Sequence, residues 1–180
     1  MMGKFTFDQG SRKRLLQVLT VFCVTFGICG LYAHFLVFNY TRSLSPGFYL
    51  KVRGEAFERG KIVIFCPDPL PNILEGQKKG YFGKGSCSCG GLPLIKVIEG
   101  VPGDHVSVTE EGVAINGRRL SGSRRAVSME TAYALPHEEI LGAHEYFVMT
   151  PHPNSFDSRY FGKVSDRLFQ STLQPIFVWE

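Results

Sequence analysis

An apolar segment near the N-terminus is the strongest pattern in this 180-residue chain. From Leu15 to Phe38 no Asp, Glu, Lys or Arg occurs, and this run of about 24 residues is long enough to cross a bilayer with some tilt. A buried core helix would also be apolar, but the basic triplet Arg12-Lys13-Arg14 at its entrance favours a membrane span. No Ala-x-Ala cleavage site follows, so we expect a retained anchor.

Beyond this segment the apolar runs are short and separated by turn residues, a pattern typical of β-rich domains. The runs predicted to be strands are 48–52, 61–65, 92–99, 106–108, 113–115, 146–149, 160–164 and 175–179. Asn116-Gly117 is a strong signal for a type I′ hairpin turn. Residues 67–91 and 121–143 are predicted loops, the second with a short helix near Glu138. The fold class is therefore mostly β, with one transmembrane helix before a compact antiparallel domain.

Charge and composition narrow the classes of function. Basic residues outnumber acidic ones in the first fourteen positions, whereas the rest of the chain is close to neutral. Positive charge beside a span stays in the cytoplasm, so we expect a cytoplasmic tail over 1–14, an anchor over 15–38 and an exported domain over 39–180. No basic stripe with interleaved aromatics occurs, so nucleic acid is not an expected partner. Membrane lipid is.

Three cysteines fall in the exported part, where oxidation is expected. The pattern favours one disulfide that joins Cys66 to either Cys87 or Cys89. A Cys-x-Cys zinc or redox site at 87–89 is the alternative, but it lacks a second Cys/His pair at ligand spacing. We therefore expect no metal and no cofactor.

Two short motifs carry candidate chemistry. Ser43 opens a Ser-Leu-Ser-Pro-Gly turn soon after the apolar segment, where a hydroxyl would be a nucleophile if a base could reach it. Taken alone, the motif favours an ordinary turn serine, because serine is common beside Pro and Gly in turns. Lys96 lies within Leu-Pro-Leu-Ile-Lys-Val-Ile, where apolar neighbours would favour the neutral amine that a general base requires. Its alternative is a lysine that extends from a half-buried strand into solvent.

The joint occurrence of these motifs in this order resembles the signal peptidase I family of serine/lysine proteases. The matching segments are Ser43–Pro46, Arg59–Val63, Lys96 with Gly100–Asp104, and Asn154–Gly162. Lys61 replaces the Asp of an Arg-Gly-Asp-like box, and residues 150–153 replace the usual lead-in to the last box. Because of these departures and the short interval over 105–149, the chain resembles the TraF-type branch of the family, which processes conjugative pilins.

This resemblance implies a role for each matching residue. Ser43 is the expected nucleophile, Lys96 its general base, and Thr41 a donor to the oxyanion. Ser155, Asp157 and Arg159 alternate by two, so on an extended segment they would share one face. Ser155 would then orient the lysine amine, and Asp157 would pair with Arg159 to brace the site, with Asp157 also a candidate to accept a proton from an attacking amine.

The resemblance further implies a bacterial inner-membrane location, a periplasmic catalytic domain, and a preprotein or pilin precursor as substrate. An extended peptide would pair with the strands at 48–52 and 94–96. Phe48, Ile64 and Ile95 are the expected substrate-binding residues, with small side chains such as Ala or Gly at the cleavage site. The acyl group would pass to water or to the substrate's own amine, which would make a circular pilin.

Three other classes of function stay open at this point. The first is a non-catalytic membrane-tethered β module that binds or scaffolds pilus components. The second is a Ser/Lys autoprotease of the repressor-like kind, which the anchor and the lack of a DNA-binding segment disfavour. The third is a thiol redox protein built on Cys87 and Cys89.

Overall fold

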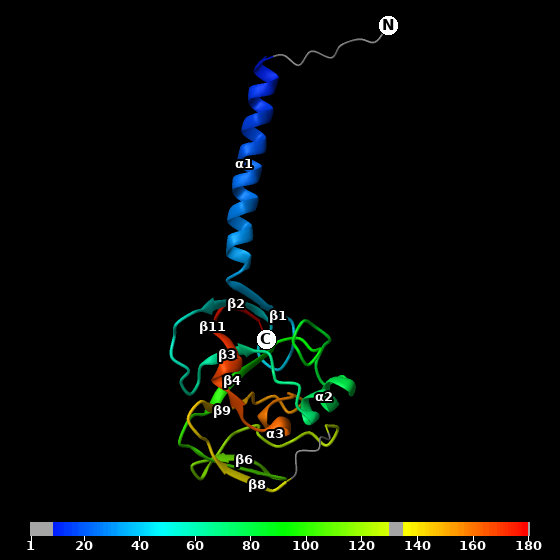
Figure 1. Ribbon diagram of the computed structural model, residues 1–180, viewed down its shortest axis with the longest axis vertical. Coiled ribbons are helices and arrows are strands. Elements are labelled where there is room, and N and C mark those ends of the chain that lie inside the picture. The colour runs from blue at the N-terminus through cyan, green and yellow to red at the C-terminus, as the bar shows by residue number, and fades with distance from the viewer. Residues whose placement is uncertain (1–8, 130–134, 180) are drawn as a thin grey trace. The chain divides into compact units, whose positions relative to one another are not determined.

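The apolar N-terminal segment forms helix α1 (Gln9–Ala33) in the computed structural model, which describes residues 9–129 and 135–179 (Figure 1). Its stretch from Arg12 to Gly30 is long and apolar enough to cross a membrane. The helix ends before the predicted limit of the span at Phe38, because Leu36–Asn39 form strand β1. The helix and the β domain that follows are two compact units, divided after Leu36.

The β domain contains two sheets. The larger sheet consists, in spatial order, of β1, β2 (Gly47–Val52), β11 (Phe169–Val178), β3 (Ile62–Phe65), β4 (Leu94–Gly100), β9 (Glu145–Met149) and β10 (Val164–Ser165). The smaller one consists of β7 (Arg118–Arg119), β6 (Gly112–Ile115), β5 (His105–Thr109) and β8 (His137–Ile140). The ladders from β2 to β10 and within the smaller sheet are antiparallel. The predicted fold class, mostly antiparallel β with one N-terminal apolar helix, is confirmed.

Strand β9 belongs to both hydrophobic cores because successive side chains on a strand face opposite sides. Val148 packs in the larger core with Val63 and Ile98, whereas Phe147 and Met149 pack in the smaller core beneath β5 and β6. The turn between β6 and β7 also follows from sequence. Positive φ angles of 51° at Asn116 and 78° at Gly117 are those of the predicted type I′ turn.

Three local predictions are wrong. The predicted loop 67–91 contains helix α2 (Pro71–Lys78), which begins with Pro at a first-turn position and buries Ile73 in the larger core. The helix predicted near Glu138 is instead strand β8, which pairs with β5. The strand predicted over 160–164 begins as helix α3 (Ser158–Phe161), capped by Asp157. Residues 1–8 of the predicted tail and 130–134 of the predicted loop lie outside the described residues.

Candidate active site

The turn that carries Ser43 is built around one buried side chain, Asn39, which is 3% exposed at the end of β1. Its Nδ2 donates to the carbonyl oxygens of Thr41, Leu44 and Ser45 at 3.1–3.3 Å. The Tyr49 hydroxyl donates to the same Ser45 carbonyl at 2.6 Å. Asn39 was not among the residues singled out from sequence, yet it fixes the backbone on both sides of Ser43.

The hydroxyl groups of this turn have a defined donor order. Because Asn39 turns its amide nitrogen to carbonyls, its Oδ1 faces Thr41 and accepts from the Thr41 hydroxyl at 2.7 Å. A hydroxyl has a single proton to donate. Thr41 Oγ1 therefore accepts in its 3.1 Å contact with Ser43 Oγ, and Ser43 is the donor. The chain of hydroxyls runs from Ser43 to Thr41 to Asn39.

Lys96 lies on β4, where inward and outward side chains alternate, and it is only 4% exposed. Its Nζ donates to the hydroxyl of Ser155, the residue predicted to orient the amine, at 2.9 Å. Burial lowers the pKa of Lys96 to about 8, while the charge of Asp157 acts to raise it and that of Arg159 to lower it. The neutral amine is thus accessible close to physiological pH.

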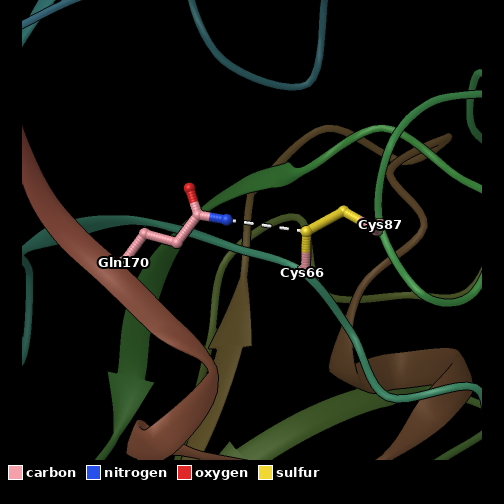
Figure 2. The surroundings of a disulfide bond; sticks show 3 residues. All are labelled: Cys66, Cys87 and Gln170. Atoms are coloured by element: carbon pink, nitrogen blue, oxygen red, sulfur yellow. Dashed lines mark hydrogen bonds between the residues drawn. A yellow bond between two sulfur atoms is a disulfide. The ribbon is translucent and has the colours of Figure 1, made fainter. Parts of the chain in front are cut away.

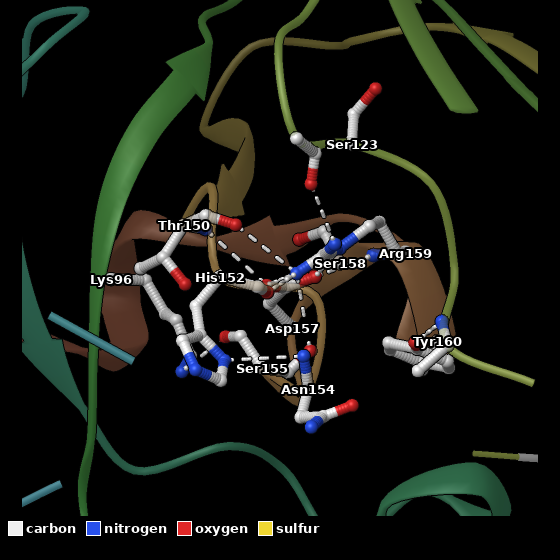
Figure 3. A network of polar contacts seen from close by, with 12 residues as sticks. Lys96, Ser123, Thr150, His152, Asn154, Ser155, Asp157, Ser158, Arg159 and Tyr160 are labelled. Atoms are coloured by element: carbon white, nitrogen blue, oxygen red, sulfur yellow. Dashed lines mark hydrogen bonds and ion pairs between the residues drawn. The ribbon is translucent and has the colours of Figure 1, made fainter. Parts of the chain in front are cut away.

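Asp157 and Arg159 form a buried ion pair behind the lysine, and both side chains are 0% exposed. Arg159 Nε and Nη2 donate to the two carboxylate oxygens, each at 2.7 Å. Its remaining donors reach the backbone carbonyls of Gly122, Arg124, Thr150, His152 and Ser155. Figure 3 shows Arg159 at the centre of this network. The pair therefore fixes the loop that presents Ser155.

Two sequence-based expectations about this pair need correction. The segment is not extended, because Asp157 caps α3 and Arg159 lies within that helix. Asp157 is also unsuited to take a proton from a substrate amine. Its carboxylate is fully buried and both of its oxygens are engaged by Arg159.

Ser43, Lys96 and Ser155 line one cavity of about 360 Å³. Ile64 and Ile95, which are predicted from the sequence to bind substrate, line it too. Phe48 is not among its lining residues; its ring packs on Phe38 with centroids 5.0 Å apart. Strand β2 lies between β1 and β11, so the prediction that it offers an edge to a peptide is wrong.

Two other strand segments border the cavity, and each has one edge that is not paired with another strand of the described residues. The β4–β9 ladder ends at the pair Val97–Met149, so within residues 9–129 and 135–179 Leu94–Lys96 have no ladder partner on that side. Strand β1 is the outermost strand of the larger sheet, and its residues from Val37 to Asn39 also line the cavity. An extended peptide could pair with either edge.

Further residues of the matching segments have structural roles. Arg59 Nη2 donates to Asp104 Oδ2 at 2.6 Å, and the same carboxylate accepts from Val101 N–H and from Asn116 Nδ2, each at 2.7 Å. These bonds organise the turn after β4. His152 lines the cavity and is half-buried, and its Nδ1 accepts the Asn154 N–H at 3.2 Å.

A disulfide joins Cys66 to Cys87, one of the two pairings that the sequence left open, while Cys89 is a buried free thiol. Figure 2 shows the bridge with Gln170, whose Nε2 lies 3.5 Å from Cys66 Sγ. Within residues 9–129 and 135–179, no group of three or more His, Cys, Asp or Glu side chains is arranged to hold a metal ion.

A buried lysine and a serine-bearing turn line one cavity of this antiparallel β domain, and comparison with known proteins identifies the family that has this class of site. The family model described as signal peptidase, peptidase S26, matches residues 12–178, and the chain belongs to this family of peptidases. The plasmid transfer protein TraF of Escherichia coli is 30% identical over 146 residues, which cover 78% of this chain and 82% of that protein. The conjugal transfer protein TraF of Agrobacterium tumefaciens (strain 15955) is 32% identical over 122 residues, covering 67% and 69%. A crystal structure of a signal peptidase I from Enterococcus faecalis V583 matches 67% of this chain and 98% of that one, with a TM-score of 0.40 and 23% identity.

Proposed function

We propose that this protein is a membrane-anchored serine endopeptidase in which Ser43 and Lys96 form the catalytic dyad. The observation that carries the proposal is the position of both side chains on one cavity, with the pKa of Lys96 lowered to about 8 by burial. A serine hydroxyl needs a base to become a nucleophile, and a desolvated lysine supplies one near neutral pH. Neither feature alone would separate a catalytic site from a structural one.

The reaction begins with neutral Lys96 taking the proton of Ser43 Oγ as that oxygen attacks the scissile carbonyl. For this transfer the Ser43 hydroxyl turns from Thr41 towards Lys96. The tetrahedral intermediate collapses to an ester on Ser43, and the Lys96 ammonium gives its proton to the departing amine. Ser155 holds the Lys96 amine in position, because its hydroxyl accepts a hydrogen bond from Lys96 Nζ. Water or another amine then attacks the ester, with Lys96 again as base.

The oxyanion is the charge that the turn must stabilise, and the backbone N–H of Ser43 is one expected donor. The Thr41 hydroxyl is the second donor that the family resemblance implies. Since its hydroxyl donates a hydrogen bond to Asn39 Oδ1 in the free protein, Thr41 must rotate away from Asn39 to donate to the substrate. This rotation would also break the hydrogen bond that Thr41 accepts from the Ser43 hydroxyl, so that this hydroxyl is free to turn towards Lys96.

The proposed substrate is a preprotein, specifically a pilin precursor of a conjugation system. Relatives named for plasmid and conjugal transfer support this choice. The peptide would lie extended along the open edges of Leu94–Lys96 and β1, with Ala or Gly at the cleavage site against Ile64 and Ile95. The proposed location is the bacterial inner membrane, with the β domain in the periplasm.

The test is mass spectrometry of candidate pilins from cells that carry wild-type protein, Ser43→Ala or Lys96→Ala. Either substitution should abolish processing, whereas Ser45→Ala, a matched change in the same turn, should retain it. A non-catalytic scaffold would be indifferent to all three substitutions. The same spectra report the fate of the ester: a linear product has free termini, and a circular one weighs one water less with no accessible terminus.

A further inference from the structure

The catalytic cavity has two apolar regions on opposite faces of the larger sheet. Ile64 and Ile95 pack in one hydrophobic cluster, with Val37 against it, and we call these three residues the aliphatic wall. Tyr81, Phe82 and Phe156 belong to the larger core on the other face, and we call them the aromatic wall. All six line the cavity, which therefore extends around the open edge of β4.

The aromatic wall is preformed. Phe82 stacks on Phe156 with centroids 5.4 Å apart and planes within 9°, and Tyr81 packs on Phe156 at 5.6 Å. Gly91 approaches the Phe82 ring so closely that a Cβ there would overlap it. The Phe82 ring therefore packs against both Phe156 and Gly91, yet both Tyr81 and Phe82 stay partly exposed where they line the cavity.

The loop that follows Tyr81 and Phe82 is braced, whereas Phe156 lies on another segment of the chain. Leu92 N–H donates to Gly83 O at 2.8 Å and Cys87 N–H to Gly91 O at 3.0 Å, which closes residues 83–92 into a narrow loop. The Cys66–Cys87 disulfide ties this loop to the end of β3 (Figure 2). A rigid wall loses little conformational entropy when a ligand binds.

The cavity is larger than the expected cleavage-site residues require. Its volume of about 360 Å³ lies within the range of small-molecule pockets, roughly 300–1,000 Å³. Side chains of Ala or Gly against the aliphatic wall would leave the aromatic wall in contact with water. Apolar surface that is fixed, concave and wet is favourable for binding an apolar group.

The residues that lead into β4 place Phe82 of this wall along a bound peptide. Leu92 and Pro93, which line the cavity just before β4, precede Lys96 by four and three residues, and Leu92 N–H donates to the carbonyl of Gly83, the neighbour of Phe82. An extended peptide advances about as far per residue as the strand beside it, roughly 3.3 Å. A peptide with its scissile bond at Lys96 therefore reaches Phe82 three or four residues away from that bond.

We propose that the aromatic wall is a second specificity site, which takes a bulky apolar side chain, aromatic or branched aliphatic, three or four residues from the scissile bond. The inference rests on the proposed peptidase function and deepens it. Substrates would then be distinguished by two features, small residues at the cleavage site and a large apolar residue at this distance.

The experiment uses full-length protein in detergent micelles and a set of fluorogenic peptides with one cleavage site. Each peptide carries either Ala or Phe at one position, three or four residues before or after the scissile bond. We expect one position at which Phe raises kcat/KM over Ala by roughly 10- to 100-fold, as burial of one large apolar side chain would give. Phe82→Ala should reduce this ratio to near one, and Phe177→Ala, an exposed aromatic outside the cavity lining, should retain it.

Equal rates for Phe and Ala at every position, or an unchanged ratio in Phe82→Ala, would overturn the inference. If Phe82→Ala does not fold, Phe82→Leu serves instead and should lower the ratio several-fold. Binding of the labelled peptides to Ser43→Ala, followed by fluorescence anisotropy, separates the two proposals. A Phe preference in binding without any cleavage by wild type would refute the peptidase function alone, and cleavage without preference would refute the specificity site alone.

Discussion

At the scale of single residues, Lys96 shows how burial changes the ionisation of a side chain. The residue is 4% exposed, and the neighbouring charges of Asp157 and Arg159 have opposite effects on its pKa. Desolvation therefore decides the outcome, because it disfavours only the charged form of the lysine. The ion pair behind it leaves little net charge near the amine while it holds Ser155 in place.

The first prediction is a pH–rate profile set by this pKa. Protonated Lys96 cannot accept the Ser43 proton, so kcat/KM should rise about tenfold per pH unit below a pH of about 8 and level off above it. The measurement is peptide cleavage across pH 5.5 to 10 with a substrate that does not titrate in this range. A profile that rises only near the pKa of a free lysine, about 10.4, would show that the base is not desolvated.

A second prediction concerns Asn39, which we regard as a positioning residue. Asn39→Ala removes the bonds that fix the turn and the acceptor of the Thr41 proton, so kcat should fall roughly 100-fold, as for a nucleophile misplaced by about 1 Å. Tyr49→Phe is the matched control, since it removes a hydrogen bond to the same turn but leaves the hydroxyl chain intact. The readouts are kcat, KM and thermal stability for both variants. Equal losses of kcat at equal stability would assign Asn39 a purely structural role.

The sequence predicts residues of this site unevenly, for a physical reason. Ser43 and Lys96 can be proposed from sequence because a serine/lysine dyad would need a hydroxyl on a turn and an amine in an apolar run. Asn39 is not, because its importance comes from carbonyls that approach it only after the turn has closed around it. Phe48 was wrongly assigned because its hydrophobicity gives no indication that β2 lies inside the sheet.

At the scale of elements, strands that pair with close neighbours were predicted well and compact helical turns were not. The β6–β7 hairpin follows from the local preference of Asn116-Gly117 for positive φ. Helix α3 is too short for a helical repeat to show, and its buried Tyr160 and Phe161 have the apolar character of a strand. Strand β8 depends on its partner β5, which lies far from it in sequence.

The third prediction tests the element that carries the aromatic wall. The Cys66–Cys87 bridge spans 21 residues, a loop whose closure stabilises a fold by about 3 kcal/mol. Cys87→Ala, or reduction of the wild type, should therefore lower Tm by roughly 6–12 °C, at the 2–4 °C per kcal/mol expected for a domain of this size. Thermal unfolding with and without reductant measures this effect. Cys89→Ala is the control, since that thiol lies outside the bridge and the variant should keep its response to reductant.

At the scale of the whole molecule, the charges before the apolar helix and the disulfide in the β domain favour the same membrane topology. The basic triplet Arg12-Lys13-Arg14 precedes the apolar stretch of α1, and the bridged cysteines follow it. Positive charge favours the cytoplasmic side, and disulfides persist on the oxidising side of the membrane. Both features support the proposed topology, in which the domain lies outside the cytoplasm, although they depend on different chemistry.

The fourth prediction uses this independence. A reporter that works only outside the cytoplasm should be active when it is fused after Glu180. When cells are denatured in the presence of an alkylating agent, Cys66 and Cys87 should stay unmodified, because the disulfide protects both sulfur atoms. Replacing Arg12, Lys13 and Arg14 with Asn should weaken the orientation signal, so a fraction of the fusion should lose reporter activity and show alkylated cysteines together. Replacing Lys78 and Lys79 with Asn is the matched control, because these lysines lie in or beside α2, within the β domain. A wild-type fusion that is active only in the cytoplasm, with reduced Cys66 and Cys87, would overturn both the topology and the proposed periplasmic site of cleavage.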